Sequence, residues 1–355
     1  MPEPSLTQRI AMAPSDYRVA IISPEWGTTS PTLYTGGLGI LAFDWGLEAA
    51  DRGWPVLGVG LGYHKGFKQI IDRNGWQTKE DIDFDPLKHG FLPLEKRVKT
   101  NISGRDVVVG GYVKHFEGRR STFPLVLLST NFQENTSWWD RGLTARVYDD
   151  GNDDPDYYKT AQFRILGSAV RLLQENGYNI QIYHLNDSHG AFVILELMNQ
   201  GLSPEQIMQM VRFTTHTPVA AAFYHFNFNK VKDALPHEAD KLKPFVNTYG
   251  NLEIARLIVK YSGAVSAVSK KHAEVSSEMD EFKGLQVIPI TNGVHLPSWI
   301  HPTKLEVYRD SFGDVLENPQ LLSDASSLDY EAFRQAHGIT QKELFWKVIY
   351  IKVKL

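Results

Sequence analysis

The sequence predicts an α/β fold in which helices cover a parallel β-sheet. Short β-branched runs, such as 17–22 and 56–60, alternate with longer helical patterns, such as 41–52 and 157–176. This alternation is typical of parallel sheets with covering helices. The chain has 355 residues, of which 42% are hydrophobic, so it can bury a large core and is not disordered as a whole.

The composition narrows the class of partner. Lys and Arg total 37 against 41 Asp and Glu, a net charge of −4, so we expect no nucleic-acid or anionic membrane partner and a neutral or anionic small substrate. No cysteine is present, which excludes disulfides, a thiolate nucleophile and Cys-ligated metal, and favours the cytoplasm. No apolar run approaches the roughly 20 residues of a membrane span. Residues 1–16 lack a secretory signal and form a polar lead-in.

The first part of the chain combines a parallel frame with inserted hairpins. A strand at 17–22, a helix at 41–52 and a strand at 56–60 open the frame. Between about 64 and 130 the pattern changes to paired β runs. These runs flank Arg73-Asn74-Gly75 in one place and Glu117-Gly118 in another, both of which are turn signals. The sequence therefore predicts antiparallel hairpins inserted into the α/β domain.

The α/β rhythm resumes after residue 156. We expect one α/β domain over 17–340, followed by a terminal tail at 341–355, and find no internal repeat. The later elements are predicted as helices at 157–176, 191–199 and 204–210, and strands at 181–184, 211–214, 264–269 and 286–289.

The first candidate loop is rich in glycine and opens the helix near Ile40. Gly36, Gly37, Leu38 and Gly39 follow the strand that ends at 23. Glycines let backbone N–H groups approach an anion closely, and a helix N-terminus favours negative charge, so the expected ligand is phosphate. The loop has neither the dinucleotide nor the P-loop spacing, and a tight structural connection is an equally good interpretation.

The second candidate loop follows the strand at 181–184. Asn186, Asp187 and His189 stand at the carboxyl end of that strand, where open α/β sheets bind ligands. The alternative is a helix N-cap formed by Asp187 or Ser188, with a histidine packed beside it. A metal site is disfavoured because the two histidines of this loop do not share a helical face.

The third candidate is His216, which directly follows the strand at 211–214. Pro218 biases the preceding residue toward an extended conformation, so the imidazole stands in an irregular turn. A purely structural histidine is the alternative. Glycine, hydroxyl, amide and imidazole groups thus meet at three strand ends, and oriented neutral donors of this kind suit a polyhydroxylated sugar.

Several motifs together resemble the N-terminal domain of the α-glucan phosphorylases, the glycogen, starch and maltodextrin enzymes. The matching segments keep the family's order from about residue 18 to 300. They are YTGGLGILAFD at 34–44, GVGLGY at 58–63, GFKQIIDRNGWQ at 66–77, HLNDSH at 184–189, THTPV at 215–219, VSKKHAEVSSEM at 268–279 and ITNGVH at 290–295.

This resemblance implies a glycosyltransferase of the GT-B type, in which two Rossmann-like domains face one another across a cleft. Glucosyl units would pass between an α-1,4-glucan and inorganic phosphate. The loop 36–39 would approach the phosphate and glucosyl groups, His216 would bond the transferred sugar, and Asn186, Asp187 and His189 would line the cleft. The family also places a sugar-contacting amide before the helix at 157, where Asn152 is the nearest match.

The sequence departs from the family at its cofactor. Phosphorylases bind pyridoxal phosphate as a Schiff base to a C-terminal lysine, and no such lysine motif occurs here. The resemblance therefore implies half an enzyme, inactive alone or completed by a C-terminal phosphorylase half. On this interpretation residues 341–355 are a final strand or helix of the domain, or the tail of a truncated reading frame.

Two other interpretations stay open. A glycogen or starch synthase also pairs Ser-x-Glu, here residues 23–25, with a Thr-Gly-Gly-Leu loop, here 35–38. Tyr34 stands where that family has lysine, and the 215–219 motif and the hairpins favour a phosphorylase. The third interpretation is a non-catalytic glucan-binding module derived from the enzyme.

Overall fold

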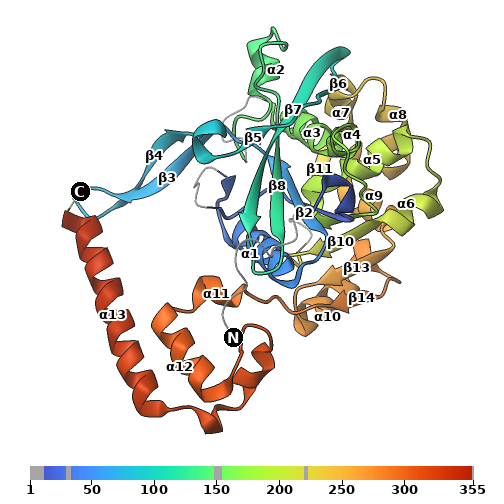
Figure 1. Ribbon diagram of the computed structural model, residues 1–355. Coiled ribbons are helices and arrows are strands. Elements are labelled where there is room, and N and C mark those ends of the chain that lie inside the picture. Colours follow the sequence, from blue (N-terminus) through green and yellow to red (C-terminus); the bar gives the residue numbers. More distant parts are fainter. Residues whose placement is uncertain (1–11, 29–32, 148–153, 220–222, 354–355) are drawn as a thin grey trace. The chain divides into compact units, whose positions relative to one another are not determined.

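The computed structural model describes residues 12–28, 33–147, 154–219 and 223–353 (Figure 1). The chain divides into two compact units, Met1–Gly293 and Val294–Leu355, which are described separately. This division differs from the boundary predicted near residue 340. The helix α13 (Tyr330–Val353) runs through that position without a break.

The first unit is built on one large, mostly parallel sheet, as the sequence predicts. The strand order is β14-β13-β10-β9-β1-β2-β8-β7-β5, and β6 pairs with β7. Neighbours from β14 to β8 are parallel, whereas β5, β6 and β7 pair antiparallel. The strands are β1 (Val19–Ile22), β2 (Val56–Leu61), β5 (Leu92–Pro93), β6 (Val98–Ile102), β7 (Arg105–Glu117), β8 (Thr122–Ser129), β9 (Ile182–Asn186), β10 (Val211–Thr215), β13 (Ala264–Ala267) and β14 (Val287–Pro289).

The direction of the strand order reverses at β1. From β1 the chain proceeds through β2 to β8 on one side, and later through β9, β10, β13 and β14 on the other. The strands β1 and β9 are therefore neighbours at the switch point: the chain leaves β1 toward β2 on one side of the sheet and leaves β9 toward β10 on the other. Open α/β sheets bind ligands at this switch point, beyond the carboxyl ends of the strands.

The predicted hairpins are confirmed. β3 (Lys65–Ile71) and β4 (Gln77–Asp83) form a separate two-stranded sheet, whose turn is closed by the Asp72 carboxylate accepting from the N–H groups of Asn74 and Trp76. β7 and β8 form the second hairpin, around Gly118. β8 also pairs parallel with β2, so this hairpin extends the main sheet. A second two-stranded sheet joins β11 (His225–Asn227) and β12 (Asn251–Glu253).

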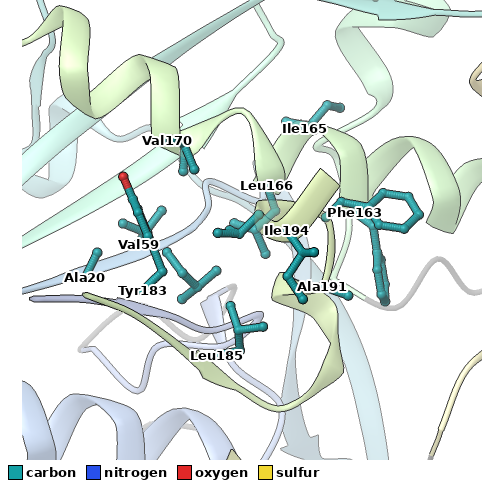
Figure 2. Close-up of a cluster of buried hydrophobic side chains, with 14 of the residues drawn as sticks. Ala20, Val59, Phe163, Ile165, Leu166, Val170, Tyr183, Leu185, Ala191 and Ile194 are labelled. Carbon is teal, nitrogen blue, oxygen red and sulfur yellow. The ribbon is translucent and has the colours of Figure 1, made fainter. Parts of the chain in front are cut away.

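Helices pack on the sheet, and one face of it forms the core drawn in Figure 2. There, side chains of β1, β2 and β9, such as Val59 and Leu185, meet side chains from α3 (Pro155–Gly167), α4 (Ala169–Glu175) and α5 (Phe192–Asn199), such as Leu166 and Ile194. All four of these side chains are fully buried or nearly so. Such burial contributes about 1.5–3 kcal/mol for each large aliphatic side chain.

The helix predicted at 157–176 is two helices in the structure. α3 ends at Gly167, whose backbone lies so close to α5 that a Cβ there would be 2.3 Å from the carbonyl oxygen of Phe192. Ser168 follows, and its hydroxyl donates to the Ile165 carbonyl. The break lets α3 and α4 both pack against α5.

The remaining helices complete each unit. In the first unit they are α1 (Gly37–Arg52), α2 (Trp138–Gly142), α6 (Pro204–Met210), α7 (Phe228–Ala234), α8 (Ala239–Leu242), α9 (Ile254–Tyr261) and α10 (Lys270–Glu278). The second unit contains α11 (Leu296–Trp299), α12 (Pro302–Phe312) and α13, with Tyr308 of α12 stacked on Phe333 of α13. Within the described residues, every helix is too short or too polar to span a membrane.

Candidate functional site

The glycine loop meets a carboxylate that follows β1. Gly36 is the N-cap of α1, and Thr35, Gly36 and Gly37 are exposed. The buried Glu25 carboxylate accepts from the N–H groups of Thr35 at 2.8 Å and Gly36 at 3.0 Å, and from the Thr35 hydroxyl at 2.8 Å. These two amides are therefore already engaged. A bound anion would use the next amides of the helix, those of Gly37 and Leu38.

The glycines of this loop fall into two kinds. A Cβ on Gly36 or Gly37 would meet no described atom within 4 Å. A Cβ on Gly39 would lie 2.6 Å from the Cβ of Tyr34 and 3.0 Å from the Cβ of Glu25. Gly39 is thus required for packing, whereas the first two leave the backbone open toward solvent.

Asn186, at the end of β9, forms hydrogen bonds with residues that follow β1 and β10. It is fully buried at the end of β9, and its amide nitrogen donates to the Ser23 hydroxyl, just beyond β1, at 3.1 Å. Its amide oxygen lies 2.6 Å from Nε2 of His216, just beyond β10. Asn186 is therefore held between Ser23 and His216, and its predicted contact with a ligand stays a prediction.

His216 is half-buried and packs against Trp45 of α1, with ring centroids 6.4 Å apart. Burial, with smaller contributions from His272 and His184, lowers the pKa of His216 to about 4. The imidazole is therefore neutral at pH 7. Since Nε2 donates to the Asn186 oxygen, Nδ1 is left as a hydrogen-bond acceptor.

Asp187 occupies a strained backbone position. Its φ is 71°, which is uncommon for a residue other than glycine, and such strain is found most often at functional sites. The carboxylate accepts from the N–H of Ser188 at 2.6 Å, so the N-cap that the sequence suggested here is present. Burial, despite the opposing Ser188 bonds and with a small contribution from Glu25, raises the pKa of Asp187.

His189 fits the packed histidine of the alternative interpretation. Its Nε2 lies 3.0 Å from the hydroxyl of Tyr224, and its ring packs on Phe163 with centroids 5.2 Å apart. Burial lowers the pKa of His189 to about 3, with a smaller contribution from Lys159. It is therefore a neutral, half-buried residue that packs against aromatic rings.

A continuous hydrogen-bonded chain joins the three predicted loops. It runs from His216 through Asn186 to Ser23, whose hydroxyl donates to the Glu25 carbonyl at 2.8 Å, and from the Glu25 carboxylate to Thr35 and Gly36. The structure thus brings together the glycine loop, Asn186 and His216 at the switch point. Asn152 lies outside the described residues.

Sequence reasoning left three residues out of the site. Glu25 caps the glycine loop, Trp45 packs on His216, and Tyr224 bonds His189. An acidic residue just after the first strand was a usable signal for Glu25. Trp45 and Tyr224 reach the site only through the packing of α1 and of the segment before β11, which the local sequence pattern does not reveal.

The structure defines an α/β protein with a cluster of hydrogen-bonding side chains at the switch point of a parallel sheet, and this cluster is the candidate ligand site. No family model matches the chain. It is 33% identical to glycogen phosphorylase of Aquifex aeolicus, covering 87% of this chain and 48% of that protein, and 33% identical to maltodextrin phosphorylase of Thermococcus litoralis, covering 80% and 36%. Glycogen phosphorylase of Mycobacterium tuberculosis is 28% identical, covering 92% and 41%.

The chain is thus homologous to the glycogen and maltodextrin phosphorylases over most of its length, which confirms the resemblance seen in the motifs. It spans less than half the length of these relatives.

Proposed function

We propose that this chain is the glucan- and phosphate-binding N-terminal part of an α-glucan phosphorylase of the GT-B type. The completed enzyme would transfer glucosyl units from an α-1,4-glucan to phosphate and release glucose 1-phosphate. The observation that carries the proposal is the hydrogen-bonded chain from His216 to the glycine loop, since it fixes a sugar acceptor and an anion donor in one rigid frame.

Each end of that frame has a defined chemical role. The N–H groups of Gly37 and Leu38 are directed along the axis of α1 and would donate to a phosphate oxygen. His216 would accept a hydrogen bond from a sugar hydroxyl through Nδ1, because Nε2 is held by Asn186. The buried Glu25 carboxylate accepts hydrogen bonds from the N–H groups of Thr35 and Gly36. These two amides are therefore not available to the anion, which would bind at the amides that follow them.

The family implies pyridoxal phosphate, and the described residues do not supply its anchor. A Schiff-base lysine is enclosed with its cofactor, but none of the described lysine side chains is buried. Lys159, the lysine that lies over Tyr224 at 5.1 Å, is partly exposed. We therefore assign no step to the cofactor here and propose that a cofactor-bearing phosphorylase half is the partner. A cytoplasmic location remains a prediction.

The proposal is tested by complementation. The purified chain of residues 1–355 is expected to form no glucose 1-phosphate from maltodextrin and phosphate, because neutral loop amides do not supply the cationic and cofactor groups that the family uses. Adding the separately expressed C-terminal half of the Aquifex aeolicus relative, loaded with pyridoxal phosphate, is expected to give phosphate-dependent glucose 1-phosphate.

The control is the C-terminal half alone. Glucose 1-phosphate formed by this chain without a partner would contradict the division of roles. Saturable maltooligosaccharide binding that is never followed by turnover in the mixture would instead favour a glucan-binding module.

Replacing His216 by alanine is expected to lower kcat/KM of the complemented enzyme about tenfold, through a lost sugar contact of about 1.4 kcal/mol. The change also leaves the buried Asn186 oxygen without its donor, so the free energy of unfolding should fall by about 1–3 kcal/mol. His184→Ala is the matched control, because His184 also packs on Trp45 but lies outside the hydrogen-bonded chain. If both variants keep normal kinetics in the folded fraction, His216 is structural.

A further inference from the structure

A cavity lies on the sheet face that carries α1, away from the core of Figure 2. Its volume is about 300 Å³. Its lining comes from α1, from strands β1, β2, β9, β10 and β13, and from residues 290–292. This volume is at the lower end of the range typical of small-molecule sites.

The floor of the cavity is polar and uncharged. His184, Thr214 and Ser266 stand on the neighbouring strands β9, β10 and β13. His184 Nε2 lies 2.7 Å from the Thr214 hydroxyl, which lies 2.8 Å from the Ser266 hydroxyl. Burial, with a smaller contribution from Arg212, lowers the pKa of His184 to about 4, so the row is neutral at pH 7.

The walls are mainly apolar and aromatic. Val19, Ile21 and Val56 project from β1 and β2, and the indoles of Trp45 and Trp54 line the same space. Trp54 is 57% exposed and marks the mouth of the cavity. One acidic residue, Glu48, belongs to the lining. Its carboxylate forms an ion pair with Nε of Arg52 at 2.8 Å, and Arg52 itself is not part of the lining.

We propose that this cavity binds a neutral, planar heteroaromatic molecule of one or two fused rings. Indole and apolar walls favour a flat aromatic ring, which can stack or pack edge-to-face against them. The hydroxyls of Thr214 and Ser266 can exchange hydrogen bonds with one ring N–H or ring nitrogen. An anion is disfavoured by the lining carboxylate, and a sugar by the scarcity of polar groups on the walls.

The site is separate from the proposed glucan site but is adjacent to it. Trp45 lines the cavity, and its ring lies 5.7 Å from His184 and 6.4 Å from His216. A bound ring would therefore contact a side chain that also packs the candidate active site.

The test uses the full chain and indole as the probe, measured by isothermal titration calorimetry. One saturable site is expected. Trp54→Ala should weaken binding about tenfold, and Ser266→Ala several-fold, through lost ring contact and a lost hydrogen bond respectively. Trp76→Ala is the matched control, because Trp76 is also exposed but lies in the turn between β3 and β4, away from the cavity. It should bind indole like the parent chain.

Indole-3-acetate, which adds a negative charge, should bind more weakly than indole. Absence of saturable indole binding would overturn the proposal, as would equal affinity in the parent chain and the Trp54→Ala variant. Since Trp54 is largely exposed, this variant is expected to fold normally, and circular dichroism checks that it does.

Discussion

Replacing Gly37 by valine is expected to abolish phosphate-dependent glucose 1-phosphate formation in the complemented enzyme, a loss of at least about 100-fold, and to leave the melting temperature nearly unchanged. Gly37 is the first residue of α1, and a Cβ there meets no described atom within 4 Å, so the fold accepts the side chain. The branched side chain instead fills the space through which a ligand reaches the amides. Losses of this size accompany the removal of one preorganised anion donor.

Gly39→Ala supplies the opposite control. Its Cβ would lie 2.6 Å from the Cβ of Tyr34, a contact that forces the loop to move, so the free energy of unfolding should fall by about 1–3 kcal/mol. Thermal melting and phosphorolysis are measured on both variants. Normal turnover by Gly37→Val would show that the loop is only a connection between β1 and α1.

Local patterns predicted most elements of the first unit because the pattern and the packing agree there. Strands such as β2 and β10 are apolar runs bounded by turn residues, and they lie within a residue or two of the predicted positions. The turn at Asn74-Gly75 needs a positive φ at glycine, which is 83° at Gly75, so its chemistry alone specifies the hairpin. By contrast, the break between α3 and α4 depends on the approach of Phe192, a contact distant in sequence.

The candidate site was predictable in its position but not in its internal connections. Strand ends could be placed at one edge of the sheet from the βαβ rhythm alone. That Asn186 would lie buried between Ser23 and His216 depends on the order β10-β9-β1, which requires strands distant in sequence to pair. Asp187 and His189 were predicted to line the cleft. In the structure Asp187 caps the short turn that follows it and His189 packs against aromatic rings, so whether a ligand touches either one remains a prediction.

The chain is expected to lose stability steeply as the pH falls from 6.5 toward 4. Burial lowers the pKa of His184, His189 and His216 to about 4, 3 and 4. In this window the unfolded chain binds protons on these histidines and the folded chain does not, so the free energy of unfolding falls as the pH is lowered. Each histidine contributes about 1.4 kcal/mol per pH unit well inside its window, or about 4 kcal/mol per unit for the three together.

One nearby group acts in the opposite direction. Burial raises the pKa of Asp187, so as the pH falls the folded chain protonates this carboxylate before the unfolded chain does. The contribution of Asp187 to the free energy of unfolding therefore increases as the pH falls. The three histidines outweigh it. Because domains are stable by only about 5–15 kcal/mol, unfolding is expected above pH 4.

Urea denaturation at several pH values between 7 and 4 measures this dependence, and His189→Gln isolates one contribution. The variant removes a group that is neutral in the folded chain and protonated in the unfolded chain, so between pH 5.5 and 4.5 its free energy of unfolding should fall less steeply, by about 1.4 kcal/mol per pH unit. His237→Gln, at an exposed position of the same unit, is the matched control and should keep the parent slope. A parent chain whose stability is flat from pH 6.5 to 4.5 would show that these histidines are not held neutral by the fold. Nδ1 of His216 would then carry a proton, and the acceptor role assigned to it would be wrong, whereas the bond from Nε2 to the Asn186 oxygen would persist.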